Sequence, residues 1–238
     1  MRRVLIVQAG STDPAVMARF GDYPAWFTRW LAPRVEVRIV RPYEERLPSL
    51  APFHAVVMSG SPRSVTEPEP WMDEAASYLL DAARSRPVLG VCFGHQLLAR
   101  ALGGRVERNP RGREAGMSEV RLTEAGRRDS LFSGIPATFA VHQQHEDHVP
   151  ELPPGATWLA ENDFSPIQAF GVRESIRCVQ FHPEFDATRS RLLNEGRRAR
   201  LDEQAPGGAR AVLASIGETP HGERLLGNWL THYVGVSP

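Results

Sequence analysis

The sequence has 238 residues, 42% of them apolar, which is enough to bury the core of one large α/β domain or two small ones. Its 28 basic residues balance its 28 acidic ones, whereas a nucleic-acid-binding protein usually has an excess of basic residues. Every one of the 28 cations is arginine, and the lack of lysine excludes a P-loop lysine, a pyridoxal Schiff base and a lysine nucleophile.

The first half of the chain alternates apolar runs with amphipathic stretches, which predicts parallel strands covered by helices on both faces. Strands are expected at residues 3–7, 35–40, 54–58 and 87–91. Helices are expected at 14–31, with a break near Gly21 and Pro24, and at 71–85 and 93–102. We therefore predict an α/β fold, a flavodoxin-like three-layer sandwich with a mostly parallel central sheet.

The second half contains shorter strand candidates, which predict either more strands at the edge of the sheet or a small antiparallel layer. They lie at residues 119–122, 138–141, 157–160, 167–170 and 176–181. After Glu184 the pattern becomes helical, with an arginine-rich stretch at 189–200, a break at 205–208, and helix candidates at 209–216 and 222–233. We expect residues 1–238 to form one domain with a helical C-terminal extension from about 186 to 238.

No targeting or membrane signal is visible in the sequence. No apolar run approaches the roughly 20 residues that span a bilayer, and the opening MRRVLIV is too short for a signal peptide. Cys92 and Cys178 are the only cysteines, too few for a disulfide framework. These features predict a cytoplasmic protein that binds neither membrane nor nucleic acid.

The strongest local signal is the stretch Gly90-Val91-Cys92-Phe93-Gly94, where a strand leads through a cysteine into a helix. Small neighbours permit a tight turn that raises the nucleophile above the sheet. The helix N-terminus favours the thiolate of Cys92, and the backbone N–H of Phe93 would face a developing oxyanion. A buried structural cysteine at a glycine-rich strand end would fit the same residues.

A second signal is His182-Pro183-Glu184, which follows the strand candidate at 176–181. In extended backbone, residues two apart point the same way, so Glu184 can orient His182 and His182 can accept a thiol proton. A surface turn is the alternative for this tripeptide. Both signals lie at strand ends, where α/β sheets bind ligands, and together they form a nucleophilic triad by role.

At this point the motifs resemble those of the class I, triad-type glutamine amidotransferases, close to the amidotransferase domain of GMP synthases and to its stand-alone relatives. The resemblance rests on MSGSPRSV (58–65), PVLGVCFGHQLLARALGG (87–104), REAG (113–116), HQQHEDHV (142–149) and VQFHPE (179–184). These motifs occur in the order of that family and span most of the chain. The tail ETPHGERLLGNWL also resembles the stand-alone relatives.

The resemblance implies an enzyme that hydrolyses the γ-amide of glutamine through a glutamyl thioester on Cys92. His182 would protonate the leaving ammonia, and Glu184 would orient His182. Phe93 would supply one oxyanion N–H, and the turn at Gly60-Ser61 the other, although many relatives have Gly-Gly-Pro where this chain has Gly60-Ser61-Pro62. The family implies no cofactor.

The stretch from His142 to His148 allows two interpretations. Three histidines at a spacing of three would suit a metal, but the stretch follows a strand candidate rather than opening a long helix, so we expect no metal site. The resemblance aligns His145 and Asp147 with a Ser-His-Gly-Asp motif that lines the glutamine pocket, and it gives Gln96 a contact with the substrate amide. Gln144 and Glu146 depart from that motif, and an acidic pair at 146–147 would suit a substrate ammonium.

The sequence leaves the substrate and the partner open. No segment resembling an ATP-pyrophosphatase follows the motifs, so we expect either a separate synthetase subunit that receives ammonia or an enzyme that acts alone on a γ-glutamyl compound. A γ-glutamyl hydrolase or peptidase with the same three residues is therefore the main alternative. A regulatory subunit without turnover is the third, and the presence of Cys92, His182 and Glu184 argues against it.

Overall fold

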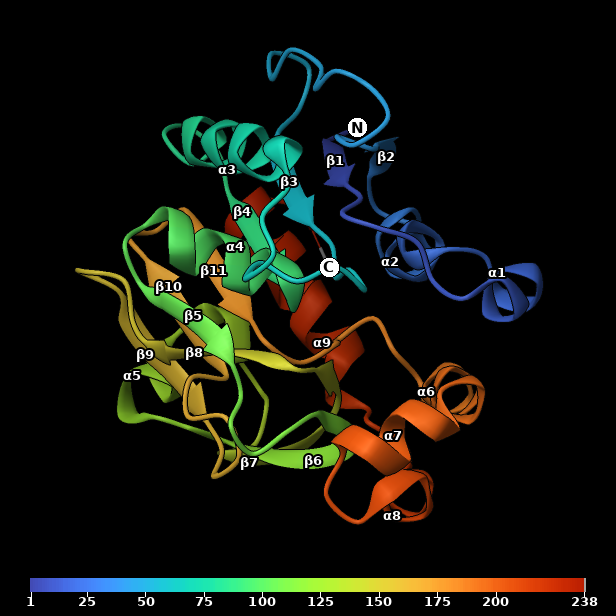
Figure 1. The fold of residues 1–238 in the computed structure, drawn as a ribbon. Helices are drawn as coiled ribbons and strands as arrows, with labels where there is room; N and C mark the ends of the chain where they lie inside the picture. The colour runs from blue at the N-terminus through green and yellow to red at the C-terminus, as the bar shows by residue number, and fades with distance from the viewer. Residues whose placement is uncertain (238) are drawn as a thin grey trace.

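The computed structural model describes residues 1–237, and its strands form two sheets. The strands are β1 (Arg3–Val7), β2 (Glu36–Val40), β3 (Ala55–Met58), β4 (Val88–Val91), β5 (Arg105–Arg108), β6 (Glu114–Leu122), β7 (Thr138–His145), β8 (Asp147–Glu151), β9 (Thr157–Glu161), β10 (Ala169–Val172) and β11 (Ile176–Val179). Nine of them form the central sheet in the order β2-β1-β3-β4-β11-β10-β9-β6-β7, and β5 pairs with β8 beside it (Figure 1).

The helices connect these strands and close the C-terminal part. They are α1 (Pro14–Phe20), α2 (Tyr23–Leu31), α3 (Pro70–Ala82), α4 (Phe93–Ala101), α5 (Glu124–Arg128), α6 (Ala187–Gly196), α7 (Arg198–Gln204), α8 (Gly208–Ser215) and α9 (His221–Asn228). A 3₁₀ turn covers Ser130–Phe132, and a π-helical segment, Trp229–Val234, continues α9. Among the described residues, no helix is both long and apolar enough to cross a lipid bilayer.

The strand directions confirm a mostly parallel sheet. β2, β1, β3, β4 and β11 are parallel neighbours. Each further pair, β11-β10, β10-β9, β9-β6 and β6-β7, is antiparallel, so only β10 and β6 among these nine strands run against the rest. The expected edge strands of the second half therefore extend the same sheet, while β5 and β8 make the separate small layer.

Helices cover both faces of the sheet, which confirms the three-layer α/β fold. Alternate residues of β1 face opposite sides: Val4 and Ile6 belong to a core with α2 and α9, and Leu5 and Val7 to a core with α3 and α4. The two buried cores explain why the central parallel strands β3 and β4 are apolar along their whole length, whereas β2 at the sheet edge is mostly exposed. Figure 1 shows α6, α7 and α8, in orange, grouped beside β6 at the lower edge of the molecule.

Several elements were not predicted from the sequence. β5 is mostly exposed and carries charged side chains, so it has no apolar alternation, and only its pairing with β8 makes it a strand. β6 begins at Glu114 rather than 119 and β7 ends at His145 rather than 141, because polar residues pair in register across these two strands. The short helix α5 depends on its cap, where the Thr123 hydroxyl accepts a hydrogen bond from Gly126 N at 3.0 Å.

Gly94 provides a test of how tightly α4 packs against the sheet. A Cβ at this position would lie 2.5 Å from the carbonyl oxygen of Met58 in β3, so Gly94→Ala should destabilise the fold. We expect a loss of roughly 1–3 kcal/mol, the usual cost of overpacking a core, measured by urea denaturation. Gly196→Ala is the matched control, since a Cβ there would meet nothing within 4 Å. Equal stability of the two variants would contradict the packing of α4 on β3.

Candidate active site

Cys92 occupies a strained turn between β4 and α4. Its φ of 52° and ψ of −100° put a non-glycine residue in the left-handed half of conformational space, where few side chains are found. The turn is possible because both flanking glycines lack a Cβ: one on Gly90 would lie 2.7 Å from the Gly94 carbonyl oxygen. The structure therefore has the geometry of the predicted elbow, and Cys92 is the N-cap of α4.

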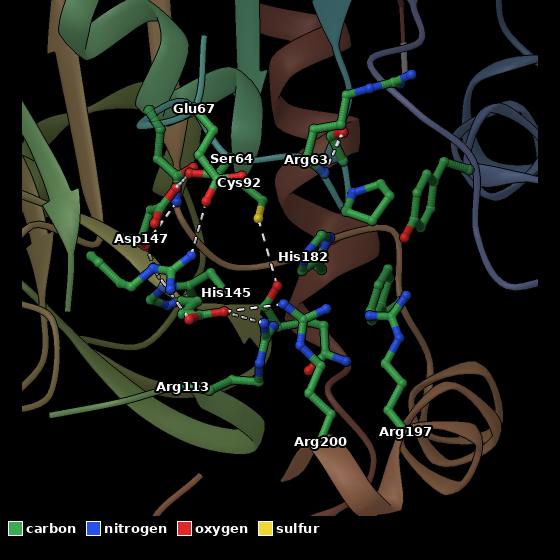
Figure 2. Close-up of a pocket in the computed structure, with 18 residues that line it drawn as sticks. Arg63, Ser64, Glu67, Cys92, Arg113, His145, Asp147, His182, Arg197 and Arg200 are labelled. Atoms are coloured by element: carbon green, nitrogen blue, oxygen red, sulfur yellow. Dashed lines mark hydrogen bonds and ion pairs between the residues drawn. The ribbon is translucent and has the colours of Figure 1, made fainter. Parts of the chain in front are cut away.

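The parallel pairing of β4 with β11 brings the two motifs together. Val91 pairs with Val179, and Cys92 N donates to the Val179 carbonyl at 2.9 Å. The chain then continues to His182, whose backbone N donates to the His142 carbonyl at 2.9 Å. Cys92 and His182 consequently line the same cavity at the carboxyl ends of neighbouring strands (Figure 2).

His182 and Glu184 form a buried pair. Their Nδ1 and Oε1 atoms are 2.7 Å apart, and the ring of His182 stacks on Phe185 with centroids separated by 4.1 Å. Burial disfavours the charged imidazole, but the Glu184 carboxylate and the Cys92 thiol outweigh it and raise the pKa of His182 to about 10. An imidazolium at neutral pH is a proton donor beside the sulfur.

Two backbone N–H groups near Cys92 suit an oxyanion. Within residues 1–237, the amides of Ser61 and Phe93 donate to no acceptor. Ser61 uses its hydroxyl instead to donate to the Ala9 carbonyl at 3.0 Å, which fixes the turn after β3. Gly60 lies against the imidazole, since a Cβ there would be 2.9 Å from His182 Cε1. The three residues predicted to form the oxyanion site, Gly60, Ser61 and Phe93, thus lie beside the cavity that Cys92 lines.

The cavity in front of Cys92 has a volume of about 140 Å³ and a polar lining. Gln96 is buried in its wall, and its Nε2 donates to the Asp147 carbonyl at 2.8 Å and to Gln180 Oε1 at 3.2 Å. Both donor hydrogens are therefore used within the protein, and the carbonyl oxygen of Gln96 is left to accept from a ligand. The predicted substrate contact Gln96 lines this cavity.

His145 and Asp147 also line the cavity, but each is held by other residues. His145 Nδ1 donates to the Asp147 carbonyl at 2.9 Å, and its Nε2 lies 3.0 Å from Glu114 Oε2. The Asp147 carboxylate accepts a short hydrogen bond from the Ser64 hydroxyl. Strands β7 and β8 position these two side chains, so the motif that was predicted to line the glutamine pocket forms part of the cavity wall.

The neighbouring Glu146 does not present a free carboxylate to a ligand. It forms ion pairs with Arg113 at 2.6 Å, Arg200 at 3.1 Å and Arg108 at 3.4 Å. The hypothesis that residues 146–147 form an acidic pair for a substrate ammonium is therefore not supported at Glu146. Gln144, where the resembling motif has serine, is buried beside Cys92, and its carbonyl lies 3.8 Å from Cys92 Sγ.

The three histidines of this stretch point to different partners. His148 lies 3.6 Å from Glu107, and His145 faces Glu114. His142 has no such carboxylate partner among the described residues, and its burial together with the positive charge of the nearby His182 lowers its pKa to about 4. In the part of the chain that the structure describes, no group of three or more His, Cys, Asp or Glu side chains could hold a metal ion.

Sequence reasoning missed one wall of the cavity. Tyr23 at the start of α2, Phe185 and the arginines 113, 197 and 200 all line it. The arginine-rich stretch at 189–200 was visible, but its side chains reach the site only because α6, α7 and α8 pack beside β6. Arg113 N donates to the Gln204 carbonyl at 2.7 Å, which joins β6 to α7.

Comparison with known proteins identifies the family. The family model for "Glutamine amidotransferase class-I" matches residues 27–195, which include Cys92, His182 and Glu184. The chain belongs to the class I glutamine amidotransferase family.

Curated proteins of two kinds are similar to this chain. It is 34% identical over 193 residues to a GMP synthase [glutamine-hydrolyzing] of Thermosipho melanesiensis, covering 79% of the chain and 34% of that protein. It is 30% identical over 139 residues to "Gamma-glutamyl peptidase 3" of Arabidopsis thaliana, covering 56% of the chain and 55% of the peptidase. The match thus spans about a third of the GMP synthase and half of the peptidase.

Solved structures confirm the fold of this amidotransferase. A glutamine amidotransferase from Thermotoga maritima superimposes with a TM-score of 0.76 at 22% identity, covering 98% of each chain. A glutamine amido transferase from Methylobacillus flagellatus also reaches 0.76, at 21% identity, covering 98% of this chain and 96% of that one.

The cause assigned to the raised pKa of His182 can be tested by titration. Replacing Glu184 with glutamine removes the carboxylate that stabilises the imidazolium while leaving the burial that opposes it, so the pKa of His182 should fall. Nuclear magnetic resonance of the ¹⁵N-labelled imidazole over a pH series measures this. Glu174→Gln is the control, because that side chain is fully exposed and pairs only with Arg177 among the described residues. An unchanged pKa in Glu184→Gln would contradict the assigned cause.

Proposed function

We propose that this amidotransferase hydrolyses the γ-amide of glutamine through a glutamyl thioester on Cys92. The observation that supports the proposal most directly is the strained Cys92 turn beside a buried His182–Glu184 pair in one cavity. Such a triad needs a nucleophile, a proton carrier and a group that orients the carrier. In this proposal Cys92, His182 and Glu184 take these roles in that order.

The reaction follows from the geometry in two steps. The Cys92 thiolate attacks the γ-carbonyl carbon, and the N–H groups of Phe93 and Ser61 stabilise the oxyanion. His182 gives its proton to the amide nitrogen, the C–N bond breaks and ammonia leaves. Water then loses a proton to His182 and attacks the thioester carbon, and the C–S bond breaks, which restores the Cys92 thiolate and the protonated His182. The new carboxyl group releases its proton, so the sum is glutamine and water giving glutamate and ammonium.

The polar lining supports binding of the glutamyl part opposite His182. The Gln96 carbonyl oxygen can accept from the substrate, and the Asp147 carboxylate can accept from its ammonium beside the bond to Ser64. Because each of these side chains is buried and hydrogen-bonded by its neighbours, the pocket is preorganised and little ordering accompanies binding. We propose Gln96, His145 and Asp147 as this part of the site.

The fate of ammonia is a further part of the proposal. The chain is similar to GMP synthases and shares the fold of a "putative gmp synthase subunit a protein" from Thermoplasma acidophilum, so a separate synthetase subunit is proposed to receive the ammonia. A γ-glutamyl peptidase that acts alone is the second candidate, since Tyr23 and Arg197 line the same cavity as His182 and would contact a larger leaving amine. Residues 1–238 as one domain and a cytoplasmic location stay predictions.

The covalent step can be tested with the two thiols of the chain. A glutamine analogue with an electrophile at the γ-position should label Cys92, and glutamine should slow the labelling because both compete for one pocket. Cys178 should stay unlabelled, since it is fully buried in β11 and burial raises the pKa of its thiol. Mass spectrometry of the digested adduct locates the label.

The matched variants are Cys92→Ala and Cys178→Ala, with release of ammonia and glutamate as the readout. Cys92→Ala should lose essentially all turnover, while Cys178→Ala should retain it because the residue only packs in the core. Labelling at Cys178, or labelling of Cys92 that glutamine does not slow, would contradict the proposed pocket. A wild-type chain without turnover on any γ-glutamyl amide would instead favour the regulatory subunit.

A further inference from the structure

The position of His182 determines where the leaving amine must lie. Since His182 donates the proton in the proposed reaction, the departing nitrogen faces this ring, and any group on the nitrogen extends past it. The ring stacks on Phe185, and Phe185 and Tyr23 both pack edge-on against Trp26, with centroid separations of 5.1 and 5.2 Å. Tyr23 and Phe185 are therefore the wall that a substituent on the amine would meet.

Arg197 lies on this wall and is only partly neutralised. Its Nε pairs with Asp13 at 2.9 Å, and its side chain is 13% exposed. Tyr23 lines the same cavity, and the positive charge of Arg197 opposes the rise in the pKa of Tyr23 that burial causes. Within residues 1–237, Asp13 is the one carboxylate that pairs with Arg197. The other N–H groups of the Arg197 guanidinium are therefore available to a ligand in the cavity that Arg197 lines.

Arginines outnumber carboxylates among the residues that line the cavity. Arg108, Arg113 and Arg200 share Glu146, and Arg108 also pairs with Glu67 at 3.2 Å. With Arg63 and Arg197, five arginines line the cavity, against the three carboxylates of Glu67, Glu146 and Asp147. Burial and the nearby Arg200 lower the pKa of Arg113 to about 10 against the pull of Glu146, as expected where cations crowd. A concave site with such an excess attracts anions.

Gln144 is a second, independent indication that the cavity binds a polar group. Its side chain is 8% exposed and lines the cavity, yet neither its amide nitrogen nor its amide oxygen has a hydrogen-bond partner in the described residues. Burying an amide without partners costs free energy, so this side chain is suited to a polar group supplied by the substrate. The backbone carbonyl of the same residue lies 3.8 Å from Cys92 Sγ.

We propose that Arg197, with Tyr23 and Arg200, forms an anion subsite for the leaving amine, so that γ-glutamyl amino acids are preferred over glutamine and other uncharged amides. The inference rests on the proposed thioester reaction and names its substrate class. The C–N bond breaks as before, the amino acid takes the proton from His182 and departs with its carboxylate beside Arg197, and water hydrolyses the thioester to glutamate. Arg197 determines specificity and takes no part in the chemical step.

The test compares γ-glutamylglycine with γ-glutamylglycinamide, which differ by one charge at nearly equal size. Wild type should favour the carboxylate by about tenfold or more in kcat/KM, the range expected for a charge-assisted hydrogen-bonded pair. Arg197→Gln should bring the ratio of the two kcat/KM values close to one. Arg198→Gln is the matched control, because Arg198 is the next residue, is exposed and does not line the cavity, so it should retain the wild-type ratio.

A second variant controls for loss of folding in Arg197→Gln, because Arg197 also pairs with Asp13 and so connects the start of α7 to the start of α1. Tyr23→Phe removes only a hydroxyl, and it should lower the same ratio without changing the circular dichroism spectrum. Equal turnover of both substrates by wild type, with glutamine hydrolysed as well, would overturn the anion subsite while the thioester reaction stands. An equal loss on both substrates in Arg197→Gln would also overturn it. No turnover of any of the three compounds by wild type would overturn the proposed reaction too.

Discussion

The parallel pairing of β4 with β11 is the constraint on which the site depends. Two strands that start far apart in the sequence end side by side, and the hydrogen bond from Cys92 N to the Val179 carbonyl, 2.9 Å long, fixes one end against the other. A third strand, β7, joins them through the His142 carbonyl, which accepts from His182 N at 2.9 Å. Backbone bonds therefore set the distance between the two motifs before any side chain contributes, and a shift of one residue in either pair would separate them.

The buried histidines differ in their protonation state. His95 and His142 are almost fully buried, and burial lowers their pKa values to about 3 and about 4, so both are neutral at neutral pH. His182 is buried as well, but Glu184 at 2.7 Å and the Cys92 thiol raise its pKa. The same low-dielectric surroundings that suppress charge on two rings strengthen the ion pair of the third. One carboxylate thus distinguishes a charged buried histidine from two neutral ones.

The sequence predicted those parts of the fold and site that depend on local patterns. Apolar runs revealed β1, β3 and β4, because both faces of these strands are buried, and alternation revealed the exposed edge strand β2. The glycines around Cys92 revealed the turn, because no larger residue fits there. β5 and β8 could not be predicted, since charged residues such as Arg105 and Glu107 form a strand there only through pairing. The ion pairs of Glu146 were equally hidden, because they join β5, β6 and α7, which are distant along the chain.

The family match ends at residue 195, and Arg197 and Arg200 come directly after it. The strained turn and the buried pair lie within the matched residues, as do Arg108 and Arg113, whereas Arg197 and Arg200 belong to the stretch that packs beside β6, where Met117 N donates to Ser215 Oγ at 3.0 Å. A change of side chain at residue 197 or 200 would therefore alter the charge of the cavity without touching Cys92, His182 or Glu184.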